Sequence, residues 1–292
     1  MYIREATEED IPQIVNLLKI SLGESLMPKS EAFWRWKHID NPFGKSPVLL
    51  AFEGDLLVGV RAFMRWEWRM GDTIFKSVRA VDTATHPEYQ GKGIFKKLTL
   101  RLVEMCEQEG IHFIFNTPNS KSMPGYLKMG WENMGKLSIR VRPILFSKPD
   151  LLEPEIFSGD IPFPIENSMN LESKMVTRYS LSFFKWRYAG NPFIKYYQIV
   201  EKEGILIYRL KKGKLGNEFR IVDQVGHNSY GHILNFAKRS KARFISSNFD
   251  HKTLLRSTLL PLGPAITVRN LDINFDFNYK LWKPMLGDME VF

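Results

Sequence analysis

The chain has 292 residues, of which 44% are apolar and 13% aromatic, so it can bury a large core and is not expected to be disordered. Its formal net charge of +9 suits an anionic ligand such as nucleic acid, anionic lipid or a phosphorylated cofactor. The single cysteine, Cys106, excludes an internal disulfide and a zinc cluster built on thiolates. No run is long and apolar enough for a membrane helix, and the charged N-terminus lacks a signal-peptide core. We therefore expect a cytoplasmic protein without a membrane partner.

The N-terminal residues predict a strand followed by a helix. Residues 2–10 fit a first strand and the start of the helix, and Thr7 with Asp10 makes a suitable N-cap pair. The apolar face of this helix is predicted at Ile11, Ile14, Leu17 and Leu18.

Residues 81–98 are the most informative segment of the chain. They predict a β-branched strand, a tight turn with two glycines and a lysine, and then an amphipathic helix that ends near Gly110. Gly91 and Gly93 let the backbone approach an anion closely, and the unpaired N–H groups at the helix start point toward it. Lys92, Lys96 and Lys97 add positive charge. The segment predicts a phosphate site, and the plain alternative is that the glycines only make the turn.

Two other phosphate motifs fit this segment poorly. A P-loop needs four residues between its glycines and then Lys-Ser or Lys-Thr, and the turn lacks this pattern. A dinucleotide fingerprint needs a third glycine at the position of Lys96.

The chain contains an internal duplication. Residues 33–37 read Phe-Trp-Arg-Trp-Lys and are followed by Asn41-Pro42-Phe43, and residues 183–187 read Phe-Phe-Lys-Trp-Arg and are followed at the same spacing by Asn191-Pro192-Phe193. Predicted strands follow each copy, at 48–52 and 56–63 in the first and at 196–200 and 205–210 in the second. Residues 79–82 are echoed by residues 220–223, and the strand at 111–115 by 243–246. Repeats of this size indicate two copies of one α/β fold.

The two copies differ after their matching aspartates. The segment after Asp223 has neither a Gln-x-x-Gly pattern nor a lysine, so the second copy keeps the scaffold without the phosphate turn. Between the copies, residues 143–168 hold five prolines and predict an extended connector. We therefore predict an N-terminal domain at 1–142, a linker at 143–168 and a degenerate second domain at 169–292.

Two motifs of the first copy resemble those of the GCN5-related N-acetyltransferase (GNAT) superfamily. Residues 86–89, His-Pro-Glu-Tyr, lead into Gln90-Gly91-Lys92-Gly93, which matches the signature Gln/Arg-x-x-Gly-x-Gly/Ala, with Phe95 where a small residue is common. The second motif of the superfamily is met by Asn119, Ser122, Tyr126, Gly130 and Trp131. The resemblance covers about residues 1–142 and implies an α/β (α+β) fold, so we expect two GNAT-like domains, each a mixed, mostly antiparallel sheet flanked by helices. Tandem arrangements of this kind also resemble the N-terminal region of broad-specificity aminoglycoside acetyltransferases.

The resemblance implies acetyl-CoA as the acetyl donor, and no metal. The loop that binds the cofactor pyrophosphate corresponds to Gln90, Gly91, Lys92, Gly93, Ile94, Phe95 and Lys96. The strand that pairs with the pantetheine arm corresponds to Thr83-Ala84-Thr85, and Asn119 belongs to the second motif.

The resemblance also suggests catalytic roles. Tyr126 is the candidate general acid for the CoA thiolate in a direct attack on the thioester within a ternary complex. Asp82 is the candidate base, directly or through water, with His112 as a second choice, although the counterpart Asp223 equally favours a structural role for Asp82. Phe33 and Trp36 fall in the region that lines the acceptor cleft in relatives, or pack in the core.

The expected acceptor is a primary amine of a small molecule, with an amino-sugar or a sugar nucleotide as the guess. One alternative is an aminoacyl-tRNA-dependent transferase of related tandem fold. Another is a non-catalytic module that binds acyl-CoA or nucleic acid, although nucleic acid is not the expected partner. The sequence does not define the oligomeric state.

Overall fold

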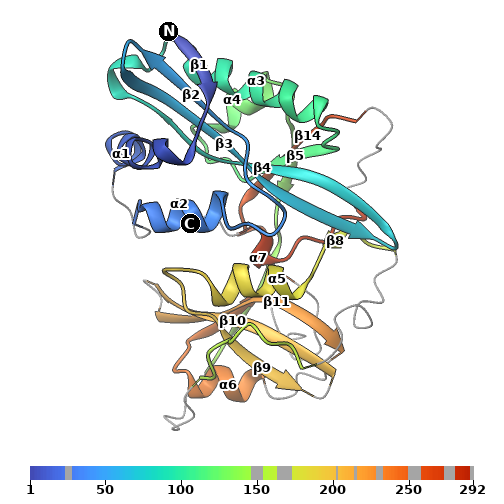
Figure 1. Cartoon of the computed structure of the whole chain (residues 1–292). Coiled ribbons are helices and arrows are strands. Elements are labelled where there is room, and N and C mark those ends of the chain that lie inside the picture. Colours follow the sequence, from blue (N-terminus) through green and yellow to red (C-terminus); the bar gives the residue numbers. More distant parts are fainter. Residues whose placement is uncertain are drawn as a thin grey trace. The chain divides into compact units, whose positions relative to one another are not determined.

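The computed structural model describes residues 1–23, 28–145, 154–162, 173–201, 203–213, 216–227, 233–248, 258–272 and 280–289. Within them the chain forms two compact units, and each is described separately (Figure 1). Among the described residues, the first unit comprises those within 1–135 and 265–281, and the second comprises those within 136–264 and 282–289. None of the helices in these ranges is long and apolar enough to cross a bilayer.

The first unit is built on a mixed sheet with the strand order β1-β2-β3-β4-β5-β14-β6. β4 and β5 run parallel, whereas the β1–β2, β2–β3, β3–β4 and β5–β14 pairs are antiparallel. Its strands are β1 (Tyr2–Glu5), β2 (Val48–Glu53), β3 (Leu56–Met70), β4 (Thr73–Thr85), β5 (Phe113–Asn116), β6 (Glu132–Lys136) and β14 (Ala265–Asn270). Its helices are α1 (Ile11–Leu22), α2 (Glu31–His38), α3 (Ile94–Gln108) and α4 (Met123–Lys128), with short 3-10 turns at Glu8–Asp10 and Pro87–Tyr89.

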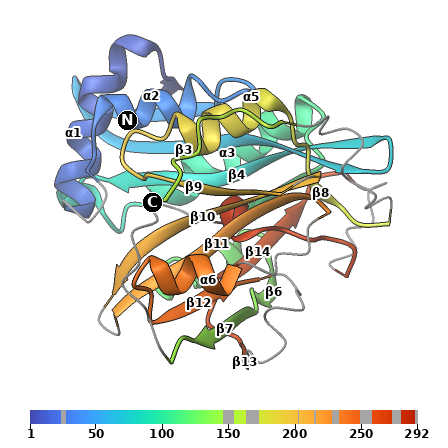
Figure 2. The same ribbon diagram turned by 90° about the horizontal axis from the view of Figure 1, so that it is seen from below.

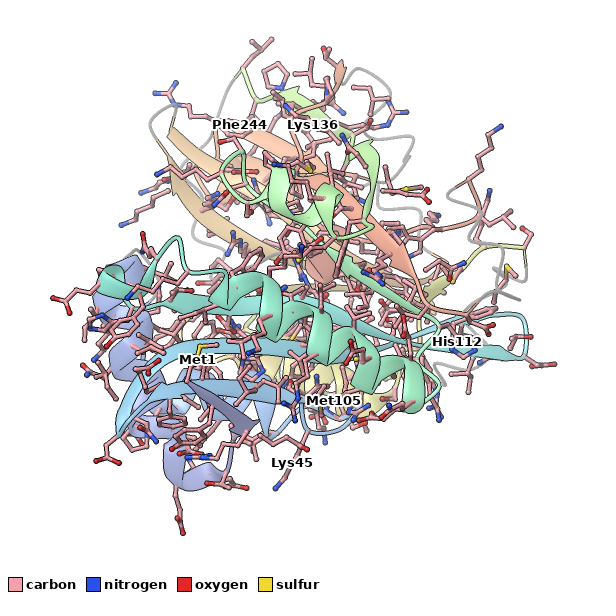
Figure 3. The ribbon with its side chains drawn as sticks, turned by 90° about the horizontal axis from the view of Figure 1, so that it is seen from above. Met1, Lys45, Met105, His112, Lys136 and Phe244 are labelled. Atoms are coloured by element: carbon pink, nitrogen blue, oxygen red, sulfur yellow. The ribbon has the colours of Figure 1, made fainter. Side chains whose placement is uncertain are left out.

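Alternate residues of β2 enter two different cores, as the period of a strand requires. Val48, Leu50 and Phe52 pack with the apolar face of α1. Leu49 and Ala51 pack instead with α3, which lies across the opposite face of the sheet and carries Met105 (Figure 3). The sheet is thus covered on both faces, as expected for a GNAT-like domain.

The second unit is also built on a mixed sheet, with the strand order β13-β7-β12-β11-β10-β9 and a parallel β11–β12 pair. The strands of this sheet are β7 (Ile139–Pro143), β9 (Tyr197–Glu201), β10 (Glu203–Gly213), β11 (Gly216–His227), β12 (Phe244–Ser247) and β13 (Thr258–Leu260). The short strand β8 (Val176–Thr177) also falls within the residues of the second unit but is not part of this sheet. The helices of this unit are α5 (Leu181–Phe184), which continues into a π-helical turn (Lys185–Ala189), α6 (Ile233–Arg239) and α7 (Leu286–Met289). Apolar residues of α6 pack onto β10, β11 and β12, and Figure 2 shows this helix over the strands.

The duplication extends to local hydrogen bonds. Ser30 and Ser180 cap α2 and α5 by accepting from the backbone N–H groups of Phe33 and Phe183, at 3.2 and 3.1 Å. After each helix an asparagine side chain closes the turn: Asn41 accepts from the N–H of Phe43 at 3.0 Å, and Asn191 from that of Phe193 at the same distance. The repeated Asn-Pro-Phe sequence is therefore a structural turn.

The unit boundaries differ from those predicted. We placed the first domain at 1–142, but β7 pairs with β12 and β13 of the second sheet. Conversely, β14 pairs with β5 and belongs to the first sheet, although its residues lie inside the predicted second domain at 169–292. Most of the predicted linker, including residues 146–153 and 163–168, falls outside the described residues. Its residue Phe157 is buried, and the N–H of Phe157 donates to the carbonyl of Tyr196 at 3.0 Å.

Candidate active site

The first unit opens between β4 and β5. The two parallel strands pair only where residues 77–79 meet residues 113–115, and β4 then continues alone on this edge to Thr85. Because the strands separate, the backbone groups of β4 beyond Arg79 have no ladder partner on β5. A cavity of about 980 Å³ lies here and is lined by residues 80–85 from β4 and 116–119 from the end of β5.

A β-bulge shapes β4 at the cavity. Arg61 and Ala62 of β3 face Thr83 and Val81, so Asp82 is the extra residue. Asp82 has a φ of 40°, which is unusual for a residue other than glycine. The bulge re-aims the last residues of β4, and these are the residues that were predicted to pair with the pantetheine arm.

The predicted phosphate loop lies at the same cavity, at the start of α3. Gly91 and Gly93 each have a φ of 77°, so both require glycine although a side chain would meet no neighbour. α3 begins at Ile94, and its first N–H groups lack intrahelical partners. Gly59 on β3 lets this end of the helix approach, since a Cβ there would lie 2.6 Å from Ile94 Cγ2.

The cavity brings together nearly all of the predicted site residues. Those that line it are Asp82, Thr83, Ala84, Thr85, Gln90, Gly91, Gly93, Ile94, Phe95, Lys96, Asn119 and Tyr126. Lys92 belongs to the loop but does not line the cavity, and its ammonium lies 4.2 Å from the ring centre of Tyr89.

The charges at the cavity are strongly unequal. Arg61, Lys96, Lys121 and Lys128 contribute positive charge, and Asp82 is the acidic residue among the described residues that line it. Lys37 and His38 already engage the Asp82 carboxylate. The cavity therefore favours an anionic ligand.

Hydrogen bonds hold the α4 end of the cavity in place. Asn119 Oδ1 accepts from the N–H groups of Lys121 and Ser122, both at 3.0 Å, and so caps the turn into α4. Tyr126 on α4 is 3% exposed and packs edge-on against Phe95, with ring centres 5.6 Å apart. Phe95 thus packs inward at the position where the superfamily commonly has a small residue.

Arg61 is a cavity residue that the sequence reasoning missed. It is fully buried on β3, and its Nη2 donates to the Tyr126 hydroxyl at 2.6 Å. The signal was present, since one arginine interrupts the apolar run of residues 57–64. A charged residue within a strand buried on both faces is a candidate functional residue.

Asp82 is held by two groups from the end of α2. Its Oδ2 accepts from Lys37 Nζ and lies in hydrogen-bond contact with His38 Nε2, both at 2.8 Å. Burial alone would raise the pKa of this carboxyl, but the Lys37 charge and the His38 hydrogen bond outweigh it and hold the pKa far below its usual range. Burial lowers the pKa of His38, opposed by the hydrogen bond and charge of Asp82. Asp82 thus stays ionised and is a weak proton acceptor.

Three other predicted residues do not line the cavity. Phe33 and Trp36 are each 6% exposed and stack on one another, with ring centres 5.4 Å apart. His112, the second choice of base, follows the C-terminal end of α3 and its ring bonds to the backbone of Lys76 (Figure 3). The structure therefore does not bring these three residues together with Tyr126.

In the second unit, β11 and β12 correspond to β4 and β5 of the first. A later segment of the same unit, residues 284–287, lies at this edge. β11 and β12 also pair over three residues, 218–220 with 244–246, before β11 continues to His227. Asn248, just after β12, donates to the carbonyl of Pro284 at 2.6 Å and accepts from the N–H of Leu286 at 3.0 Å. A Cβ on Gly287 would lie 3.1 Å from the carbonyl oxygen of Val222 on β11. Residues 284–287 therefore contact both diverging strands.

Known proteins resemble this chain in sequence over residues 2–134 and in fold over nearly its whole length. Residues 2–134 match the family described as an acetyltransferase (GNAT) domain. Among solved structures, a GCN5-related N-acetyltransferase from Anabaena variabilis is 17% identical with a TM-score of 0.65, covering 93% of this chain and 73% of that one. A conserved protein from Enterococcus faecalis, described as a probable N-acyltransferase, is 11% identical with a TM-score of 0.68, covering 92% and 72%. Eis1 from Mycobacterium abscessus is 13% identical with a TM-score of 0.59, covering 94% and 74%.

A search of curated protein sequences finds no match to the chain. At these identities the structural matches establish the fold, and the family match covers residues 2–134 of the unit that contains the cavity. The chain therefore carries an acetyltransferase domain of the GNAT superfamily at residues 2–134, together with a second sheet.

Proposed function

We propose that the cavity of the first unit binds acetyl-CoA and that the chain transfers its acetyl group to a primary amine of a small molecule. The observation that carries the proposal is the meeting, in one cavity, of the unpaired edge of β4, the glycine loop before α3 and Tyr126. Acetyl-CoA carries phosphates, an amide-containing arm and a thioester, and these three features match that lining in chemistry. GNAT enzymes use acyl-CoA donors, and acetyl is the acyl group proposed here.

Each part of the lining has a proposed role. The backbone N–H groups of Gln90, Gly91, Lys92, Gly93, Ile94, Phe95 and Lys96 bind the pyrophosphate, together with the Lys96 ammonium, which lines the cavity. The edge of Thr83-Ala84-Thr85 pairs with the pantetheine amides, and its N–H groups polarise the thioester carbonyl. On this edge the Thr85 carbonyl already accepts from the Ser21 hydroxyl at 3.0 Å. Asn119 holds the turn that places α4.

The proposed reaction is a direct attack. The neutral amine nitrogen forms a bond to the thioester carbon, the C–S bond breaks, and its electron pair leaves with sulfur. The Tyr126 hydroxyl supplies the proton that converts the thiolate to the CoA thiol, and the nitrogen loses one proton in exchange. No covalent acyl-enzyme forms.

We assign Asp82 to orienting the amine. Both contacts from α2 engage Oδ2, so Oδ1 is available at the cavity for a hydrogen bond from the acceptor nitrogen. A carboxylate held ionised by Lys37 binds an amine but abstracts its proton weakly. From the sequence, Asp82 was a candidate either for the general base or for a structural role. Orienting the amine differs from both.

An acetyl-transfer screen tests the proposal. Amino-sugars, sugar nucleotides, aminoglycosides, polyamines and peptides are each incubated with acetyl-CoA, and release of free CoA thiol is measured. We expect turnover with a small amine, and an amino-sugar or sugar nucleotide to be the best acceptor. Binding of acetyl-CoA without transfer to any amine would indicate a non-catalytic acyl-CoA module. Failure to bind acetyl-CoA, shown by no thermal shift, would overturn the cofactor assignment.

A further inference from the structure

Arg61 is a buried cation without an acidic partner among the described residues. Its Nη2 donates to the Tyr126 hydroxyl at 2.6 Å and its Nη1 to the carbonyl of Val81 at 3.3 Å. The rest of the guanidinium is covered by aromatic rings, with centres 4.9 Å away for Phe63, 5.5 Å for Phe95 and 5.4 Å for Tyr126. Nε has no hydrogen-bond partner. Burying a charge in this way is costly and is not expected of a residue that only fills space.

The contact with Tyr126 has a direction. The guanidinium can only donate, so the Tyr126 oxygen must accept. The hydroxyl's own proton has no acceptor among the described residues, and Tyr126 lines the cavity. The bond therefore leaves this proton available to a ligand.

We propose that Arg61 is a positioning residue that acts through Tyr126. By occupying a lone pair of the hydroxyl, it aims the O–H at the cavity, and its positive charge stabilises the oxygen when that proton leaves. The inference rests on the proposed function: the proton passes from Tyr126 to the CoA sulfur as the C–S bond breaks, and the hydroxyl is restored by the proton lost from the amine nitrogen. Arg61 takes no part in the bonds that form and break.

A purely structural arginine would give a different pattern on substitution. It would support folding or cofactor affinity, but would not govern the ionisation of a ligand thiol. Arg65 offers a matched control, because it lies on the same strand, pairs with Glu109 at 2.6 Å and does not line the cavity.

The test uses CoA and desulfo-CoA, so it requires no acceptor. The thiolate of bound CoA is followed by ultraviolet absorbance against pH, with the desulfo-CoA complex as the blank. We expect the bound thiol to ionise about one pH unit lower in the wild type than in Arg61→Met or Arg61→Gln. Arg61→Lys retains the positive charge, so in this variant the bound thiol should still ionise at a lowered pH, although less so than in the wild type. In the control Arg65→Met the bound thiol should ionise at the wild-type pH. The single variant Tyr126→Phe should by itself abolish this lowering of the ionisation pH. Adding Arg61→Met to Tyr126→Phe should then cause no further change in the thiol titration.

Kinetics with the best amine of the screen provides the second readout. Arg61→Met should lower kcat about 10- to 100-fold, the worth of one hydrogen bond from a charged donor, with the KM for acetyl-CoA changed less than about threefold. An unchanged thiol titration in both Arg61→Met and Arg61→Gln would overturn the inference while leaving the proposed function intact. If neither CoA nor desulfo-CoA bound the wild type, the proposed function and this inference would both fail.

Discussion

The two units carry the same strand edge, and each uses it differently. In the first unit, β4 and β5 separate around a cavity of about 980 Å³ that contains Tyr126 and the glycine loop. In the second, β11 and β12 pair over the same short length, and residues 284–287 contact both strands. The comparison shows that the same strand edge borders a cavity in the first unit and carries a segment of the chain itself in the second.

The aspartates themselves show the difference most clearly. His38 and Tyr188, at matching positions of the duplicated segments, each contact the aspartate of their own unit, Asp82 and Asp223. In the first unit, Lys37 adds a positive charge to the carboxylate. In the second, burial and the neighbouring Asp288 raise the pKa of Asp223 well above its usual range, against hydrogen bonds from Tyr188 and Tyr179 that lower it.

The largest expected effect concerns the glycine loop. Valine at Gly91 or Gly93 should weaken acetyl-CoA binding about 100-fold, because β-branched residues are strained at the φ of 77° found there. The measurement is the thermal shift as a function of acetyl-CoA concentration. Gly226→Val, at a φ of 79° in β11, is the matched control and should reduce stability without changing acetyl-CoA affinity. If all three substitutions weakened acetyl-CoA binding equally, the assignment of the cofactor site to the glycine loop of the first unit would be contradicted.

The aspartates should respond unequally to the same substitution. Asp82→Asn leaves Lys37 buried without its charged partner, so it should lower the free energy of unfolding by about 3 kcal/mol. Asp223→Asn removes a carboxyl whose ionised form is disfavoured, and should cost markedly less at neutral pH. Urea denaturation of both variants measures the two values. A larger loss for Asp223→Asn would contradict the assigned charge environments.

The packing of residues 284–287 against β11 can be tested by substituting Gly287. An added Cβ would lie 2.0 Å from the Tyr188 hydroxyl, so Gly287→Ala should lower the free energy of unfolding by about 1–3 kcal/mol. Acetyl-CoA affinity should not change, because the proposed site lies in the first unit. Calorimetric unfolding with and without acetyl-CoA measures both quantities. Loss of acetyl-CoA binding with an unchanged free energy of unfolding would contradict the placement of the acetyl-CoA site in the first unit.

The smallest effect is a difference in pH dependence. The native pKa of Asp82 is lowered, so its stabilisation is present above the usual carboxyl pKa, about 4, and is lost as pH falls below it. The native pKa of Asp223 is raised, so stability falls as pH rises above about 4, where the unfolded chain ionises first. Asp82→Asn should flatten the acid side of the stability profile, and Asp223→Asn the side between about pH 5 and 7.5. Profiles parallel to that of the wild type would contradict these assignments.

Local patterns in the sequence predicted much of this molecule. The strand–turn–helix at residues 81–98 is present as the end of β4, the turn and the start of α3, and the duplicated Phe-to-Asn-Pro-Phe segments share caps and turns. These features depend on neighbours close in the chain, where spacing and turn chemistry are sufficient.

Features that depend on distant pairing were not predicted. The place of β14 beside β5 depends on contacts between residues about 150 positions apart, such as Thr267 with Asn116, which no local pattern encodes. Arg61 was missed because the charge within an apolar run does not indicate its partner, Tyr126, which lies 65 positions further along the chain. Phe33 and Trp36 have a spacing that suits a core or a cleft equally, so only the structure could show that they do not line the cavity.

The central claim is that the chain has one acetyl-CoA site, in the first unit. Isothermal titration of the full chain with acetyl-CoA tests it most directly, with Gly93→Val as the companion protein. We predict one binding event per chain, which Gly93→Val greatly weakens. Two equivalent events, or one that persists unchanged in Gly93→Val, would contradict the claim.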